Sequence, residues 1–170
     1  MTFLLNSAIA HNNLEYLLLR LKEGVDPNIR EYLIPLQVSY NTNNLQAMEI
    51  LLEYRADPNI IDKNDIYNRN SDNSQTIFTN IISDMLRKIT TNMLEIQQGL
   101  PEIDNLSSDI KKYLKLLISW GADMNIGNPT AQEMIIQFNA ESSRFIQNII
   151  DEIQEENKTY RAMAKKHNYL

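Results

Sequence analysis

The sequence contains no cysteine, and its 170 residues include only four glycines, five prolines and one tryptophan. Without cysteine the chain can form no disulfide, no thiolate nucleophile and no cysteine-ligated zinc site. So few glycines argue against a glycine-rich phosphate-binding loop, and no P-loop, dinucleotide-binding or nucleophile-elbow motif occurs. Basic residues are outnumbered, with 16 lysines and arginines against 22 aspartates and glutamates. The net charge of −6 argues against a nucleic-acid-binding protein.

Long hydrophobic runs are missing as well. No stretch approaches the roughly 18 apolar residues of a transmembrane helix, so we expect no membrane span. Residues 1–13 lack a basic start and their apolar stretch is interrupted by Asn6 and Ser7, so we expect no signal peptide. The expected location is the cytoplasm, or the cytoplasm of a host cell after delivery. With 43% hydrophobic residues, the chain has the size of one domain that buries roughly two-thirds of its unfolded surface.

The sequence does contain one kind of segment three times, at residues 19–29 (LRLKEGVDPNI), 51–60 (LLEYRADPNI) and 114–126 (LKLLISWGADMNI). Asp57 follows Asp26 by 31 residues, and Asp123 follows Asp57 by 66 residues. The second spacing is close to twice a repeat of about 33 residues. Apolar residues at helical spacing run up to each turn, which predicts helices over 14–22, 45–53 and 109–119. The chain is therefore predicted to repeat a helical unit, with insertions in the third copy.

The ends of the three helices carry their own signals. Gly24 and Gly121 stand where a helix C-terminus needs a left-handed residue, which glycine adopts without steric cost. Arg55 occupies that position in the middle copy. Either Arg55 takes a strained conformation that costs on the order of 1 kcal/mol, or this helix ends differently. The aspartate that follows accepts hydrogen bonds from nearby backbone amides, and Pro27 and Pro58 fix φ for the turn.

Residues 34–59 (IPLQVSYNTNNLQAMEILLEYRADPN) resemble the ankyrin repeat. The residues that carry the resemblance are Pro35 and Leu36 at the first helix, Asn43 and Asn44 between helices, Ile50, Leu51 and Leu52 in the second helix, and Ala56, Asp57 and Asn59 in the closing turn. Residues 4–28 resemble the same unit, and residues 109–126 resemble its second half. The resemblance implies an all-α, ankyrin-repeat-like solenoid of stacked antiparallel helix pairs with short β-turn fingers. We expect one domain over 1–170, with units at about 1–29, 30–60 and 61–126 (with insertions) and a C-terminal cap at 127–170.

The third unit departs from the pattern in two places. Residues 62–75 (DKNDIYNRNSDNSQ) are polar and predict an extended finger loop. Apolar residues then recur at helical spacing from Ile77 to Ile96, which predicts one long helix beginning near Thr76. We expect this apolar stripe to be core, with a partner-binding face as the alternative. Residues 101–109 are predicted to be a loop in which Ser107, Ser108 or Asp109 caps the next helix. The last helix is predicted over 140–166.

In the ankyrin family, the resemblance implies, partner proteins contact the hairpin tips and the exposed inner side of the first helices. The corresponding tips here are Arg30, Glu31 and Tyr32 in one unit and Asp62, Lys63, Asn64 and Asp65 in the next. Tyr67 is added because tyrosines in polar loops often carry a large share of binding energy. Asn41 and Thr42 are the inner helix positions chosen, beside Ala10 and His11.

The sequence thus predicts a non-catalytic module that binds another protein, without cofactor, metal, nucleic acid or membrane. We expect a monomer, with a homodimer through the C-terminal helix as the alternative. One variant, suggested by the abundance of asparagine and isoleucine, is an effector of an intracellular bacterium or a virus that acts on a host protein. Another alternative is an enzyme with its site in segment 62–108, which would need a pocket of buried titratable groups beside Asp84, Arg87 and Lys88.

Overall fold

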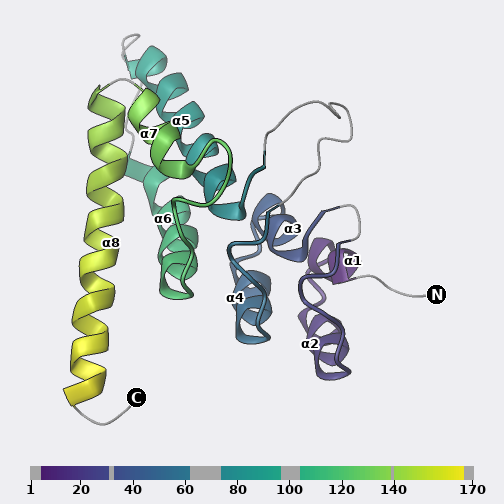
Figure 1. The fold of residues 1–170 in the computed structure, drawn as a ribbon. Coiled ribbons are helices and arrows are strands. Elements are labelled where there is room, and N and C mark those ends of the chain that lie inside the picture. The colour runs from purple at the N-terminus through teal and green to yellow at the C-terminus, as the bar shows by residue number, and fades with distance from the viewer. Residues whose placement is uncertain (1–4, 31–32, 62–73, 97–103, 139, 167–170) are drawn as a thin grey trace.

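The computed structural model describes residues 5–30, 33–61, 74–96, 104–138 and 140–166. Across these ranges the chain forms eight helices and no strand, so this part of the protein is all-α (Figure 1). In chain order the helices are α1 (Leu5–Ala10), α2 (Leu14–Lys22), α3 (Pro35–Asn41), α4 (Leu45–Glu53), α5 (Ile77–Ile96), α6 (Asp104–Ser119), α7 (Ala131–Gln137) and α8 (Ala140–Lys166). None of the helices in these ranges combines the length and apolar character of a membrane span.

The helices contact one another as four hairpins, α1 with α2, α3 with α4, α5 with α6, and α7 with α8. The second helices of the hairpins form a row in which α2 contacts α4, α4 contacts α6, and α6 contacts α8 (Figure 1). Among the first helices, α1 packs on α3 and α5 packs on α7. Helices α3 and α5 are not among the pairs in extensive contact. The middle of the first-helix row is therefore its most loosely packed junction.

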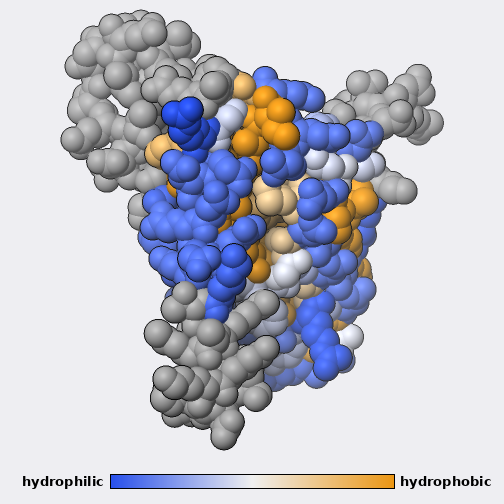
Figure 2. Space-filling view, turned by 60° about the vertical axis from the view of Figure 1, so that its left-hand side comes forward, coloured by the Kyte–Doolittle hydropathy of each residue, from blue (hydrophilic) through white to orange (hydrophobic). Residues whose placement is uncertain are grey.

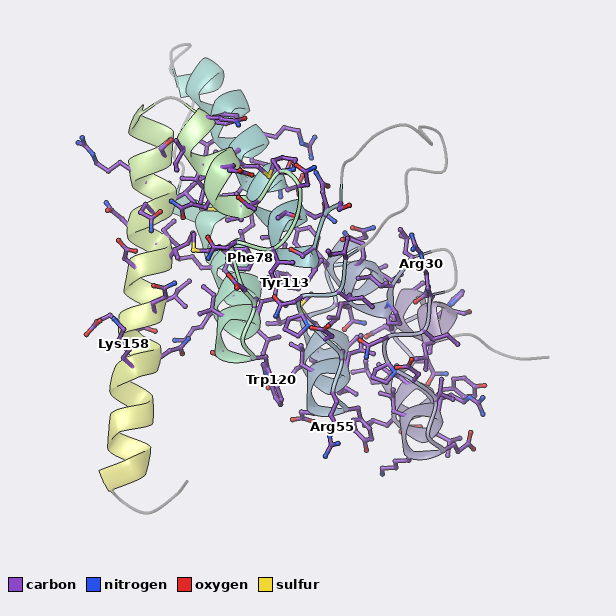
Figure 3. The ribbon with its side chains drawn as sticks, in the orientation of Figure 1. Arg30, Arg55, Phe78, Tyr113, Trp120 and Lys158 are labelled. Carbon is purple, nitrogen blue, oxygen red and sulfur yellow. The ribbon has the colours of Figure 1, made fainter. Side chains whose placement is uncertain are left out.

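One hydrophobic cluster runs through all eight helices. The stripe of α5 is part of this cluster, and its buried members are Ile77, Phe78, Ile81, Ile82, Met85, Leu86 and Ile89. Phe78 lies near the centre of the molecule (Figure 3). The prediction that the stripe is core is confirmed over these positions, and the side chains of α5 beyond Ile89 lie outside the description. A long helix that covers its own apolar side in this way adds core without adding a hairpin.

Most predicted helix bounds agree with the structure, but the start of α6 does not. The helix begins at Asp104, so the prediction of a loop up to residue 109 is wrong for residues 104–109. This segment contains neither glycine nor proline. No residue type in the segment therefore prevents the helix from starting before residue 109. The last helix, Ala140–Lys166, has the predicted bounds.

Each second helix that precedes an aspartate turn ends on a residue in the left-handed conformation. The φ angles are +87° at Gly24, +70° at Arg55 and +89° at Gly121. Arg55 therefore takes the strained conformation, which was one of the two predicted outcomes. Arg55 lies at the end of α4, and Trp120 lies at the neighbouring end of α6 (Figure 3). The turn at this position has the same geometry whether or not the residue is glycine.

The hydrogen bonds explain why the geometry is retained. At the end of α4 the Arg55 amide donates to the Leu52 carbonyl at 2.9 Å, and the Ala56 amide donates to the Leu51 carbonyl at 2.9 Å. These two bonds are the Schellman pattern, which satisfies carbonyls that the helix leaves unpaired. The same pair of bonds closes α2 at Gly24 and α6 at Gly121. The hydrogen bonds thus offset much of the strain at Arg55.

Paired asparagines connect the two helices of the first two hairpins. Asn12 and Asn43 both have φ of +52° and end α1 and α3 in the left-handed conformation, which asparagine tolerates better than most residues. The next residues, Asn13 and Asn44, accept hydrogen bonds from the amides of Tyr16 and Ala47 and so cap α2 and α4. Two adjacent asparagines therefore end one helix and begin the next.

Asparagine side chains also join each aspartate turn to the next one. The Asp57 amide donates to Asn28 Oδ1 at 2.7 Å, and Asn28 Nδ2 donates to the Arg55 carbonyl at 3.4 Å. Asn59 repeats this arrangement with the third turn, as the Asp123 amide donates to its Oδ1 at 2.7 Å and its Nδ2 donates to the Gly121 carbonyl at 3.0 Å. We call Asn28 and Asn59 the asparagine ladder. Through it the turns after α4 and α6 lie side by side, although Asn59 and Gly121 are 62 residues apart in the sequence.

Helix α8 packs against α6, which also contacts α4. Lys115 Nζ lies 2.6 Å from Glu156 Oε2, Lys111 Nζ lies 3.7 Å from Glu152 Oε2, and Ser119 Oγ lies 3.2 Å from Asn157 Oδ1. The buried residues of α8 are Ile146, Ile149, Ile150 and Ile153, and most of its other described residues up to Lys158 are exposed and polar. Turned toward this side, the molecule is mostly hydrophilic, with a hydrophobic band in the upper middle (Figure 2).

The left-handed positions generate a prediction about stability. A Cβ added at Gly24 or Gly121 meets no atom within 4 Å, so a Gly→Ala change there costs backbone strain alone, about 1 kcal/mol. Arg55→Gly relieves the same strain but adds unfolded-state entropy, so we expect a gain of about 0.5 kcal/mol in the free energy of unfolding. Urea denaturation measures all three variants. A loss of stability in Arg55→Gly would contradict this account of the turn.

The asparagine ladder generates a second prediction. Asn59→Ala removes two hydrogen bonds between turns and leaves the Asp123 amide without its partner, so we expect a loss of about 1–2 kcal/mol. The matched control is Asn125→Ala, because the Asn125 side chain bonds only to Asp123 within its own turn among the described residues. We expect the control to cost under about 0.5 kcal/mol. Equal losses in the two variants would show that the hydrogen bonds between turns contribute no more to the free energy of unfolding than a bond within one turn.

Candidate functional site

The structure describes three of the ten sequence-predicted binding residues. Arg30 is exposed where the chain leaves the first aspartate turn, well away from Arg55 (Figure 3). Asn41 and Thr42 are exposed at the C-terminal end of α3. The other seven predicted residues lie outside the described ranges, namely Glu31, Tyr32, Asp62, Lys63, Asn64, Asp65 and Tyr67. Their role stays a prediction. Of the predicted binding surface, the structure describes mainly the part around the end of α3.

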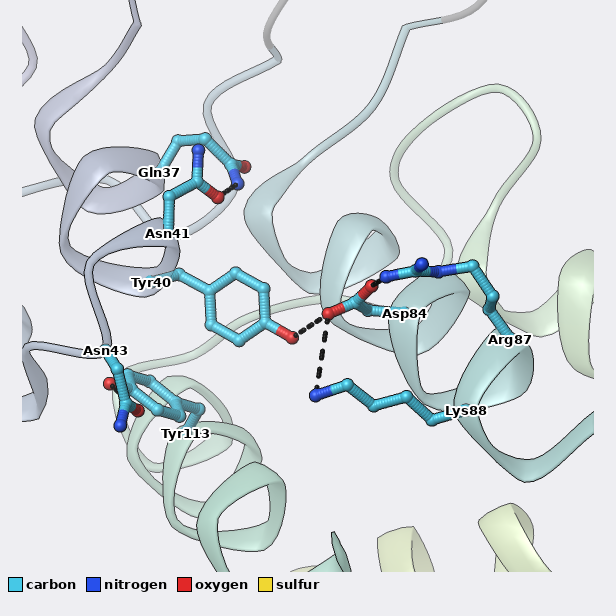
Figure 4. Close-up of polar contacts among 8 residues, drawn as sticks. All are labelled: Gln37, Tyr40, Asn41, Asn43, Asp84, Arg87, Lys88 and Tyr113. Atoms are coloured by element: carbon cyan, nitrogen blue, oxygen red, sulfur yellow. Dashed lines mark hydrogen bonds and ion pairs between the residues drawn. The ribbon is translucent and has the colours of Figure 1, made fainter. Parts of the chain in front are cut away.

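Asn41 belongs to a row of amide side chains that connects α3 to α5. Gln37 Nε2 donates to Asn41 Oδ1 at 2.8 Å, and Asn80 Nδ2 donates to Gln37 Oε1 at 2.6 Å (Figure 4 for the first of these). Gln37 is only 8% exposed, so both ends of its amide need partners, and both have them. The row fixes the direction of the Asn41 side chain at the surface.

A second connection between the two helices centres on Asp84 of α5. The Tyr40 hydroxyl of α3 donates to Asp84 Oδ2 at 3.0 Å, Arg87 donates to Asp84 Oδ1 at 2.6 Å, and Lys88 Nζ lies 3.9 Å from Oδ2 (Figure 4). One carboxylate therefore accepts hydrogen bonds from a phenol and a guanidinium and forms a longer ion pair with an ammonium group. We call Tyr40, Asp84, Arg87 and Lys88 the junction cluster, because it spans the loosely packed junction between α3 and α5.

Tyr113 of α6 packs against Tyr40 of the junction cluster. Its ring meets the Tyr40 ring edge-on, with 5.2 Å between centroids and an interplanar angle of 88°. Its hydroxyl donates to Asn43 Oδ1 at 3.1 Å, which ties α6 to the turn between α3 and α4 (Figure 4). Edge-on aromatic pairs are favourable beyond the area that they bury. The position of Tyr40 is therefore fixed from both α5 and α6.

The charges of the junction cluster stabilise one another. Burial alone would raise the pKa of Asp84, but hydrogen bonds from Arg87 and Tyr40 and the charge of Lys88 outweigh it, so its pKa lies below the ordinary value. Burial first, and then the neighbouring Asp84 charge, raise the pKa of the Tyr40 hydroxyl well above its usual range. At neutral pH the carboxylate is ionised and the phenol is protonated. The pair is suited to holding hydrogen bonds rather than to exchanging protons.

Sequence patterns did not bring these residues together. From the sequence, Asp84, Arg87 and Lys88 are expected only as the surroundings of a possible enzyme pocket, and no pattern points to Tyr40. Tyr40 and Asp84 are 44 residues apart, and no periodicity relates them. The i to i+3 and i to i+4 spacing of Asp84 with Arg87 and Lys88 was the available signal, since such charges pair on a helix.

Outside the junction cluster, the described residues form few features that resemble a site. Among the described residues, no group of three or more His, Asp or Glu side chains is placed to hold a metal ion. Large hydrophobic side chains at the surface lie at several places on the molecule and include Leu19, Ile29, Ile61, Trp120, Ile136, Phe138 and Phe145. Single exposed hydrophobic residues are common on soluble proteins. Comparison of the chain with protein-family models, curated proteins and solved structures finds no match.

The lowered pKa of Asp84 predicts a pH-dependent stability. Its ionised form contributes stability that is fully present above the unfolded pKa of about 3.9 and is lost as pH falls through the folded pKa. We expect Asp84→Asn to unfold about 1 kcal/mol more easily than the wild type between about pH 5 and pH 7, and the difference to shrink below about pH 3.9.

Urea denaturation at several pH values measures this difference. Asp151→Asn is the control, because it removes the same charge from the exposed side of α8 and corrects for the change in net charge. A wild-type advantage that stayed constant into strong acid would contradict the assigned role of the Asp84 carboxylate.

Proposed function

We propose that the chain is a divergent ankyrin-repeat-like solenoid whose function is the non-catalytic binding of another protein. The observation that carries the proposal is the asparagine ladder. Asn28 and Asn59 make the same two contacts with the turn that follows, so three turns have equivalent neighbours. Equivalent contacts between successive units are what a stack of repeats requires.

The first-helix row supports a binding role for the surface around α3. The exposed residues at the end of α3 are polar, and the charged side chains at its junction with α5 are held in mutual contacts. Rigid side chains lose little entropy on binding, which favours recognition. The proposed surface combines Asn41 and Thr42 with the fingers that begin at Arg30 and at residue 62. The partner is a protein, and no cofactor takes part.

The C-terminal helix fits the role of a cap. A terminal unit of a stack needs one apolar side toward its neighbour and one polar side toward water. Helix α8 has both, with four isoleucines buried against the rest and acidic and amide residues outside. We therefore propose a monomer in which residues 127–170 close the stack, located in the cytoplasm of its own cell or of a host.

Affinity capture with designed variants tests the proposal. Ala10→Arg with Thr42→Arg places two long charged side chains at the exposed ends of α1 and α3. The matched control, Asn148→Arg with Gln154→Arg, makes the same kind of change on the exposed side of α8. The wild type and both variants are used as bait, and bound proteins are quantified by mass spectrometry.

We expect at least one protein to bind the wild type and the α8 control alike and to bind the α1/α3 variant about tenfold less, because the new side chains obstruct the proposed surface. Retention of every captured protein by the α1/α3 variant would reject this surface as the binding site. Captured proteins that are lost only from the α8 control would move the site to the cap.

A further inference from the structure

The junction cluster supplies every charged side chain that the structure describes in α1, α3 and α5, and Glu133 of α7 is the other described charge of the first helices. Helices α1 and α3 contain no charged residue, and the described side chains of α5 include three, Asp84, Arg87 and Lys88. Two of the three are cationic, in a chain whose net charge is −6. With two cations and one anion, the junction cluster therefore carries a net positive charge on a protein that is acidic as a whole.

The three charges lie at different depths. The side chain of Asp84 is 28% exposed, that of Lys88 is 39% exposed and that of Arg87 is 75% exposed. The Asp84 carboxylate is thus the innermost of the three groups. Its oxygens accept hydrogen bonds from Tyr40 and Arg87 and pair with the Lys88 ammonium group. A ligand that approaches the surface meets the cations before it meets the carboxylate. Within the roughly 8 Å over which charges act at physiological salt, the cluster attracts anions.

The ion pairs of the junction cluster contribute little to stability. An exposed ion pair within one helix contributes only about 0.3–0.5 kcal/mol, and a second cation beside the same carboxylate adds less. Asp84 also keeps Arg87 oriented, so part of the cost of ordering its long side chain is met before a ligand arrives. A guanidinium has five donors in a planar fork, which matches a second carboxylate in geometry.

We propose that the junction cluster binds an acidic segment of the partner protein. This inference rests on the proposed function and names the chemistry of the partner. An aspartate or glutamate of the partner places its carboxylate against the Arg87 guanidinium and the Lys88 ammonium group. The segment lies along the junction between α3 and α5, where the Asn41 amide, oriented by Gln37, donates to its backbone.

Peptide display on the full chain tests this inference. A library of random linear peptides is selected on the wild-type protein, and the enriched peptides are synthesised and titrated by fluorescence anisotropy. The test variant is Arg87→Gln with Lys88→Gln. The matched control is Arg20→Gln with Lys22→Gln, which removes the same two charges from α2, in the other row of helices. Circular dichroism confirms the helix content of both variants.

We expect the enriched peptides to contain aspartate or glutamate. They should bind the test variant about tenfold or more weakly, bind the control like the wild type, and lose affinity as salt rises to about 0.5 M. The salt titration uses the wild type alone, so it reads the charge contribution even if the test variant is destabilised.

The remaining outcomes separate two failures. One outcome is that the enriched peptides are neutral or basic, bind both charge variants equally and fail to bind Ala10→Arg with Thr42→Arg. This result would overturn the proposal of an acidic segment but would support the proposed binding surface. Peptides that bind every variant with wild-type affinity would overturn both the surface and the acidic segment. Failure of the library to yield any binder would overturn the proposal that a linear acidic segment is recognised.

Discussion

The interaction on which the structure depends is a carboxamide that spans two turns. In the turns after α4 and α6, the carbonyl of the left-handed residue and the amide of the following aspartate both bond to one asparagine side chain of the preceding turn. An asparagine side chain has a donor and an acceptor side by side, so one residue satisfies both groups. Asn59 does this for Gly121 and Asp123, which follow it by 62 and 64 residues. Contact between turns is therefore independent of how much chain lies between them.

That independence explains how the third hairpin accommodates the longer helix α5. The turns and the second helices remain in one row, while α5 is lengthened and packs on α7 rather than on α3. The junction between α3 and α5 is consequently joined by side chains, through Gln37 with Asn80 and Tyr40 with Asp84. Burying these polar groups requires that each has a partner, which orders them. The third hairpin thus has ordered charged side chains on its first helix, whereas α1 and α3 contain no charged residue.

The sequence predicted what short-range chemistry determines and missed what packing determines. The helix ends at Gly24 and Gly121, the asparagine turns and the α5 stripe follow from local propensity and periodicity. The choice at Arg55 could not be made, because strain and hydrogen bonding there are of similar size. The start of α6 was placed too late because serines near Asp109 also suit a helix cap. The contact of Tyr40 with Asp84 depends on how two helices rotate against each other, and no local pattern encodes that rotation.

Hydrogen exchange at the Asp123 amide tests the central claim most directly. This amide lies in an exposed turn, and its partner is the Asn59 side chain. Measured by NMR, its exchange should be slowed relative to an unstructured peptide in the wild type and should become fast in Asn59→Ala while the amides of α6 stay protected. An Asp123 amide that exchanges at the unstructured rate in the wild type, with α4 and α6 protected, would show that the turns are not joined.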